Sequence, residues 1–329
     1  MPNWPDFRTG LNPYGLTYHL GLQGRGTSRL NPDGKGLEGF LALGDEIGAR
    51  AMEIFDPWIE GYSDDEMARL RDRLDAVGIT PIVSGGLITG ETDAMFRSAK
   101  LLGAPTIRFA LTNVLCGDRA FRDDWEDMRR AVTARITELG PKAADQGIMI
   151  AIENHQDFTS AELVEFCGMA PGVGITYDTG NSFPVAEAPL DFTRNVAPYV
   201  RHLHLKDYNV QFTPEGFRLV RCAIGDGAVP FAEVFDILGQ HHETMTAVLE
   251  PGALEARHVR LFTPEWWQGY APKDARALAA CLLAAQRNRL AEGADYRTPW
   301  QRAGYDMLVY YELTMIRKSA SNMKSLGIL

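Results

Sequence analysis

Short apolar segments alternate with amphipathic helical segments along this 329-residue chain, and this alternation most limits how the chain can fold. Apolar runs of about four to eight residues are typical of buried strands, whereas apolar positions three and four residues apart predict helices. Several of the helical segments end in glycine just before the next apolar run, which is a helix-stop signal. We therefore expect strands at residues 8–16, 50–55, 79–85, 105–111, 147–154, 172–178, 200–206 and 246–250.

Eight strands that are each followed by a helix predict an α/β fold of the (β/α)8 TIM barrel type. An open, doubly wound sheet is the alternative, but no G-x-G-x-x-G follows a strand. We expect the barrel to span residues 1–292, with 272–292 as its eighth helix. Residues 293–329 form a C-terminal helical extension whose apolar face packs on the barrel or on a second subunit of a homo-oligomer.

The composition narrows the class of protein. A formal net charge of −10 lacks the basic footprint of a nucleic-acid binder. The four cysteines contain no C-x-x-C pair, which argues against a disulfide framework or a thiolate zinc site. The chain shows no signal pattern at its start and no apolar run long enough to span a membrane. We expect a cytoplasmic protein without a membrane or nucleic-acid partner.

Charged side chains stand at the ends of four consecutive predicted strands: Glu153, Asp178, His204 and Glu250. In such barrels the chemistry lies at the carboxyl ends of the strands. Strand alternation directs all four side chains inward, since the residues between them form the apolar face expected against the helices. Three carboxylates and one imidazole repel one another without a cation, and an oxygen-rich set suits one Mn²⁺ ion, with Mg²⁺ or Co²⁺ as substitutes.

The segment YVRHLHLKDYNV places His202, His204 and Lys206 on one face of the seventh strand. His204 is the candidate metal ligand. His202 lies one step deeper in the barrel and is either a structural histidine or a substrate contact. Lys206 lies one step nearer the mouth, where it meets a substrate oxygen or pairs with Asp178 or Asp207.

The motifs AIEN, YDTGN, HLHLKD and VLEPG resemble the sugar phosphate isomerase/epimerase superfamily of xylose-isomerase-like barrels, over roughly residues 8–290. The resemblance implies that Glu153, Asp178, His204 and Glu250 bind one divalent metal ion. It implies that Glu153 and Glu250 exchange protons with the substrate across an enediolate. It also implies that GDGAVPF (225–231) is the turn that leads into the helix after strand seven.

Two positions depart from the ketose 3-epimerases of that superfamily. Asn181 stands where they carry a histidine, and KDYNV replaces the segment in which they carry an arginine. In exchange, His155 follows AIEN directly and is a candidate acid or base. A group that protonates a leaving oxygen suits a lyase, hydratase or decarboxylase. The candidate substrate-binding residues are Lys206, Arg108, Asn181 and His202, and at lower rank Tyr18, His19, Glu53, Asp56, Trp266 and Trp267.

The sequence therefore favours a metal-dependent enzyme that removes a proton next to the carbonyl of a keto sugar or sugar acid, with an isomerase, epimerase or lyase outcome. The small-molecule substrate is a carbohydrate. An endonuclease-IV-like DNA repair nuclease is a remote alternative, because such enzymes need further ligands, including a histidine where DTGNSF has none. A non-catalytic sugar-binding barrel is the third class considered.

Overall fold

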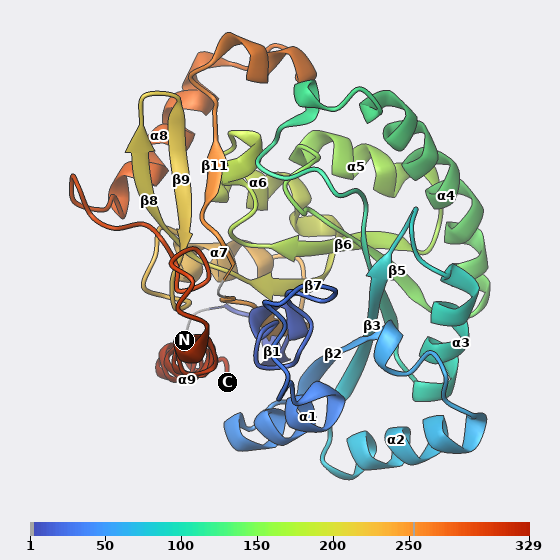
Figure 1. The fold of residues 1–329 in the computed structure, drawn as a ribbon. Coiled ribbons are helices and arrows are strands. Elements are labelled where there is room, and N and C mark those ends of the chain that lie inside the picture. Colours follow the sequence, from blue (N-terminus) through green and yellow to red (C-terminus); the bar gives the residue numbers. More distant parts are fainter. Residues whose placement is uncertain (1–2, 253) are drawn as a thin grey trace.

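A closed barrel of parallel strands forms the centre of the molecule (Figure 1). The computed structural model describes residues 3–252 and 254–329. The barrel strands in these ranges are β1 (Asp6–Leu11), β2 (Ala51–Phe55), β3 (Thr80–Gly86), β4 (Thr106–Ala110), β5 (Met149–Glu153), β6 (Val173–Asp178), β7 (Val200–Leu205) and β10 (Thr244–Leu249). They pair in the order β1-β10-β7-β6-β5-β4-β3-β2, which confirms the (β/α)8 prediction.

Helices surround this barrel (Figure 1). Two of them begin with reciprocal capping boxes, Ser63 with Glu66 and Thr159 with Glu162. Two others end at Gly48 and Gly103, whose φ angles of 78° and 68° favour glycine, as the predicted stop signals require. The helices are α1 (Gly36–Ile47), α2 (Asp64–Ala76), α3 (Thr92–Leu102), α4 (Trp125–Asp145), α5 (Ser160–Met169), α6 (Pro189–Val196), α7 (Phe231–Leu238), α8 (Ala275–Arg287) and α9 (Leu308–Leu326).

The two faces of each barrel strand differ in chemistry. Ile150 and Ile152 of β5 belong to the large apolar core that the strands share with the helices. A separate small cluster of Ala51, Ile82 and Val248 fills part of the interior. Register aligns Asp178 with His204 and Thr246 with His202, so polar side chains of neighbouring strands share layers inside the barrel. The predicted inward direction of the charged residues follows from this alternation.

A small antiparallel sheet was missed by the sequence analysis. It consists of β8 (Tyr208–Thr213), β9 (Gly216–Arg221) and β11 (Arg257–Val259), in the order β11-β9-β8. The β8–β9 hairpin is inserted between β7 and the GDGAVPF turn, which lies directly before α7 as expected. YNVQFT and GFRLVR do alternate apolar and polar residues around Pro214 and Glu215, which was the available signal.

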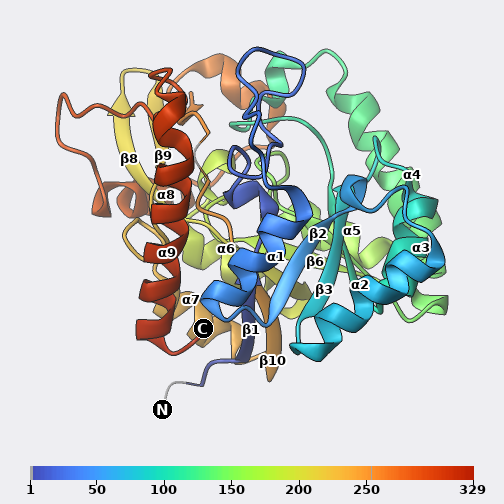
Figure 2. The ribbon, with the colours of Figure 1, turned by 60° about the horizontal axis from the view of Figure 1, so that its bottom comes forward.

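The C-terminal helix α9 lies on the outside of its own barrel, beside α1 (Figure 2). Its buried face includes Ile316 and Met323, and Arg317 pairs with Glu46 of α1. The Thr9 hydroxyl of β1 donates to the Ile328 carbonyl, and α9 contacts β10. The sequence analysis expected α8 to be the eighth barrel helix. In the structure α8 packs beside α6, and Arg289, two residues after α8, forms a parallel bridge with Val210 of β8. The domain division at residue 292 and the homo-oligomer stay predictions.

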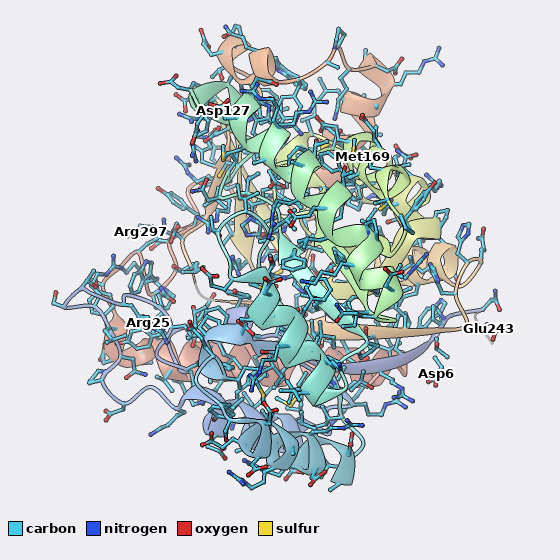
Figure 3. The ribbon with its side chains drawn as sticks, turned by 90° about the vertical axis from the view of Figure 1, so that its right-hand side faces the viewer. Asp6, Arg25, Asp127, Met169, Glu243 and Arg297 are labelled. Carbon is cyan, nitrogen blue, oxygen red and sulfur yellow. The ribbon has the colours of Figure 1, made fainter. Side chains whose placement is uncertain are left out.

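The two ends of the barrel are distinct. Asp6 and Glu243 mark the end where β1 and β10 begin, with the Asp6 amide donating to the Glu243 carbonyl at 2.7 Å. Arg25 and Arg297 both lie on the opposite side of the molecule (Figure 3), and Arg29 donates to the Trp300 carbonyl at 3.0 Å. The long β1–α1 loop and the segment before α9 therefore meet near the carboxyl ends of the strands. Among the described residues, no helix has both the length and the apolar character needed to cross a bilayer.

Candidate metal centre

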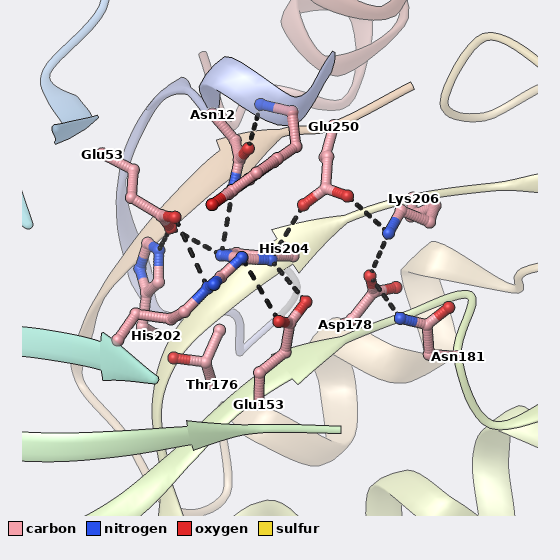
Figure 4. A network of polar contacts seen from close by, with 12 residues as sticks. Asn12, Glu53, Glu153, Thr176, Asp178, Asn181, His202, His204, Lys206 and Glu250 are labelled. Atoms are coloured by element: carbon pink, nitrogen blue, oxygen red, sulfur yellow. Dashed lines mark hydrogen bonds and ion pairs between the residues drawn. The ribbon is translucent and has the colours of Figure 1, made fainter. Parts of the chain in front are cut away.

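Four side chains from four strands converge inside the mouth of the barrel (Figure 4). Each of Glu153, Asp178, His204 and Glu250 offers one ligand atom, and these atoms all lie within 4.8 Å of one another. All four residues are buried. Nδ1 of His204 lies 3.0 Å from Oε1 of Glu153 and 2.9 Å from Oε2 of Glu250. The residues selected from the strand ends are thus brought together by the fold.

The other ring nitrogen of His204 faces a carboxylate that the sequence analysis ranked only as a sugar contact. Oε2 of Glu53 lies 2.6 Å from Nε2 of His204 and 3.5 Å from Nε2 of His202. His202 also has its Nδ1 2.8 Å from the Thr246 hydroxyl oxygen. Glu53 therefore orients the candidate ligand from behind. The sequence feature that could have identified Glu53 is that it is the one acid at an inward position of the apolar strand RAMEIF.

Two buried cations hold the acidic groups in place. The Arg108 guanidinium lies between Glu53 and Glu153, at 3.4 Å and 3.3 Å from their oxygens. Lys206 Nζ lies 2.5 Å from both Asp178 and Glu250, so the Asp178 pair considered from the sequence is present. Burial alone would raise the pKa of Glu153, but Arg108 and His204 lower it to about 2. Burial raises the pKa of Asp178 to about 6, against the opposing effect of Lys206.

The charge of this cluster fits one divalent cation. Four buried carboxylates face two cations, so with His204 neutral the cluster lacks two positive charges; the residues are Glu53, Glu153, Asp178, Glu250, Arg108 and Lys206. Buried carboxylates without compensating charge are costly. Glu153 Oε2 and Glu250 Oε2 are buried, and their polar contacts in the described residues are the ion pairs with Arg108 and His204. Oxygen-rich donors with one imidazole are ligands that Mn²⁺ and related ions accept.

The segment after β1 covers the cluster. Asn12 Nδ2 lies 3.2 Å from His204 Nε2, and the Asn12 side chain caps the short helix η1 (Pro13–Gly15). Tyr14, in η1, is partly buried beside the cluster: burial and the acids Glu53, Glu153 and Glu250 raise its pKa to about 12, although Arg108 lowers it. A Cβ on Gly15 would lie 3.2 Å from the Glu250 Cα, so a glycine permits this close approach. Neither Asn12 nor Tyr14 was singled out from the sequence.

The remaining predicted residues lie around the same mouth. His155 is partly exposed, its Nδ1 is buried without a partner, and burial lowers its pKa to about 4. Asn181 Nδ2 donates to Asp178 at 2.8 Å, and the Tyr208 hydroxyl donates to the Asn181 oxygen at 3.4 Å. Their roles in catalysis or substrate binding stay predictions.

Several lower-ranked candidates have packing partners of their own. The amides of Tyr18 and His19 donate to Glu312 of α9 at 3.0 Å and 2.7 Å. Trp266 is fully buried and its indole N–H donates to the Cys116 carbonyl at 3.0 Å. These contacts explain why the residues are held where they are without a ligand.

The comparison with known protein families agrees with this architecture. The family model described as xylose isomerase-like TIM barrel matches residues 41–266. The chain belongs to this family. The match includes all four converging residues.

Individual relatives are distant. The uncharacterized protein YihM of Escherichia coli K12 is 30% identical over 113 residues, which make up 34% of this chain and 35% of YihM. The match thus spans about a third of the length of this curated relative. Such a partial match leaves the activity of the whole protein to be proposed from the site.

Solved structures share the fold at low sequence identity. D-psicose 3-epimerase, solved in the presence of D-fructose, has a TM-score of 0.52 at 20% identity, over 86% of this chain and 93% of that one. The 3-keto-D-glucoside 4-epimerase YcjR of E. coli has a TM-score of 0.51 at 13% identity, over 75% and 92%. The IolI protein, with a bound zinc atom, has a TM-score of 0.50 at 14% identity, over 85% and 96%.

Proposed function

We propose that this protein is a divalent-metal-dependent enzyme that removes a proton next to the carbonyl of a keto sugar or sugar acid. The observation that carries the proposal is the buried set of Glu153, Asp178, His204 and Glu250, whose ligand atoms lie within 4.8 Å of one another. With His204 neutral, as a metal ligand must be, the charge deficit of two around this set supports a divalent ion. Membership in the family and the fold shared with two sugar epimerases support a carbohydrate substrate.

A divalent ion held by these four residues would polarise the substrate carbonyl and stabilise the negative charge of an enediolate. Glu153 of β5 and Glu250, just after β10, approach His204 from strands separated by β6 and β7. The pKa of each is lowered despite burial, chiefly by Arg108 for Glu153 and by Lys206 for Glu250. Both are therefore ionised near neutral pH. One carboxylate accepts the proton from the substrate carbon. The other can return a proton on the opposite side only after it has itself taken one up from solvent.

His155 supports a second outcome at the same site. Its Nδ1 has no hydrogen-bond partner among the residues that the structure describes, and Glu153 and Lys206 are near enough to affect its pKa. Burial lowers that pKa to about 4, so the imidazole is neutral at pH 7 and can accept a proton on one nitrogen while donating from the other. A proton delivered to a leaving oxygen would convert isomerisation or epimerisation into elimination. A lyase, hydratase or decarboxylase is therefore the alternative activity.

The metal site is tested first by plasma mass spectrometry of the purified protein. We expect about one Mn²⁺, Mg²⁺ or Co²⁺ ion per chain, lost in Glu153→Gln and His204→Ala and retained in the exposed control Glu38→Gln. Proton abstraction is then measured as the incorporation of deuterium from solvent into ketoses and 3-keto sugars. A product of unchanged mass identifies an epimerase or isomerase, whereas loss of water, CO₂ or an aglycone identifies a lyase. A wild-type protein that holds no divalent ion would refute the proposal.

A further inference from the structure

Arg221 is a buried cation without an acidic partner. It ends β9, opposite Tyr208 in the register of the hairpin, and only 6% of its surface is exposed. The one hydrogen bond of its side chain among the described residues runs from Nη1 to the Pro251 carbonyl, at 3.5 Å, and its Nε is buried without a partner. No carboxylate in residues 3–252 or 254–329 lies within 4.0 Å of its guanidinium, since no ion pair involves it.

Its pairing state distinguishes Arg221 from the other buried arginines. Arg108 lies against two carboxylates, and Arg119 pairs with Glu162 through both terminal nitrogens. Within the described ranges, these two and Arg221 are the arginines that count as buried. Removing a guanidinium from water without an anion beside it destabilises the folded protein. A protein retains such a group at a site where an anion arrives from outside.

The guanidinium borders the candidate metal centre. A Cβ on Gly252, two residues after Glu250, would lie 2.2 Å from Nη1 of Arg221 and 3.3 Å from the Tyr14 carbonyl oxygen. Arg221 also contributes to lowering the pKa of Glu250. The side chain therefore stands between η1 and the end of β10, at the edge of the mouth that the substrate would enter.

The other charged groups around the mouth do not balance the positive charge of Arg221. One divalent ion would neutralise the four carboxylates together with Arg108 and Lys206, so none of those acids has charge left for Arg221. Glu312 of α9 is close enough for the charge of Arg221 to lower its pKa. The two carboxylate oxygens of Glu312, however, accept hydrogen bonds from the amides of Tyr18 and His19. The anion that Arg221 lacks is thus not supplied by residues 3–252 or 254–329.

We propose that Arg221 binds an anionic group of the substrate, a carboxylate or a phosphate, beside the metal-chelating carbonyl. This inference rests on the proposed function and narrows its substrate to sugar acids or sugar phosphates. Guanidinium groups bind both anions through paired N–H donors. Arg108 was the sequence-based candidate for this role, but two carboxylates of the chain already share its charge.

The test measures binding to the Mn²⁺-loaded protein by isothermal titration calorimetry. The probes are D-gluconate, inorganic phosphate and the neutral D-glucitol. We expect D-gluconate or phosphate to bind more tightly than D-glucitol, and Arg221→Gln to weaken the anion by about 10- to 100-fold, as for a charged hydrogen bond. Binding of D-gluconate but not phosphate would indicate a substrate with a carboxylate. Binding of phosphate but not D-gluconate would indicate a phosphorylated substrate.

Two further variants make the test specific. Arg218→Gln is the matched control, because Arg218 lies three residues earlier on β9 and stacks on Tyr296 instead. Arg221→Lys keeps the positive charge and should retain part of the affinity, which covers the case in which Arg221→Gln does not fold. Equal binding of the anions to wild type and both Arg221 variants, or no binding of either anion to wild type, would overturn the inference. Metal content measured on the same samples tests the proposed function separately.

Discussion

Glu53 and His204 form a close pair at the back of the candidate metal centre, with Oε2 of the acid 2.6 Å from Nε2 of the imidazole (Figure 4). The carboxylate thereby accepts the Nε2 proton and leaves Nδ1 directed at Glu153 and Glu250. Carboxylates in this position fix the tautomer and orientation of metal-binding histidines. Glu53 is in turn held by Arg108, so one chain of contacts connects β4, β2 and β7.

Replacing this acid should weaken metal binding without removing a ligand. We expect Glu53→Gln to raise the Kd for Mn²⁺ by about 10- to 100-fold, the usual effect of losing such a partner. The free ion can be followed by electron paramagnetic resonance during titration. Glu38→Gln, which disrupts an exposed pair between Glu38 of α1 and Arg73 of α2, should leave the Kd unchanged. Equal affinities for the Glu53 variant and wild type would mean that His204 needs no support from β2.

The sequence predicted the barrel and the four converging residues because both depend on local periodicity. Alternation along each strand decides which side chains point inward, so Glu153 and Asp178 could be assigned from neighbouring residues alone. The support around them could not be assigned in this way. Asn12, Tyr14 and Arg221 reach the mouth through a loop and a hairpin whose path depends on tertiary packing, and Arg221 lies 17 positions after His204 in the chain.

The packing partner of the C-terminal helix α9 could not be predicted from the sequence either. An apolar helical face at α9 was recognisable, but its partner was not, since packing on the barrel and packing on a second subunit produce the same pattern. Arg317 pairs with Glu46 and Asn322 donates to the Ile224 carbonyl, so α9 packs on the chain's own barrel, whereas contact with a second subunit stays a prediction. The sequence contains no short-range signal for contacts across such separations.

Asp207 should contribute strongly to stability, because it organises the turn before α7. Its two oxygens accept the amides of Tyr208, Gly225, Gly227 and Val229 at 2.8–3.0 Å. An amide at this position presents an N–H₂ group to two of these donors, so we expect Asp207→Asn to lower the free energy of unfolding by about 2–4 kcal/mol. Urea unfolding at pH 8 measures the change. The exposed control Asp191→Asn should change it by less than about 0.5 kcal/mol.

Glu312 should make stability depend on pH. Burial raises its pKa from 4.5 to about 7, although the His19 and Tyr18 amides oppose the rise. The folded protein therefore binds more protons than the unfolded chain between these values, and this group's contribution to stability falls as the pH rises from about 4.5 to 7. The upper limit of the effect is about 3 kcal/mol.

The variant Glu312→Gln isolates this contribution, because its amide oxygen still accepts a backbone amide but does not titrate. Urea midpoints of both proteins should be compared at steps between pH 5 and pH 8. We expect the difference between wild type and variant to shift in favour of the variant as the pH rises. A difference that stays constant across this range would show that the carboxyl of Glu312 titrates as in the unfolded chain.

Gly252 tests whether the position of Arg221 matters for anion binding. Its φ angle is +63°, and a Cβ there would lie 2.2 Å from Nη1 of Arg221, so Gly252→Ala must displace the guanidinium. We expect the variant to weaken D-gluconate or phosphate binding by about 10-fold while the Kd for Mn²⁺ stays unchanged. The left-handed backbone adds a destabilisation of about 1–2 kcal/mol. Gly293→Ala provides the matched control, since Gly293 has a φ of +76° but no heavy atom within 4 Å of the added Cβ. If both variants bind the anions as wild type does, the placement of Arg221 beside Glu250 has no part in recognition.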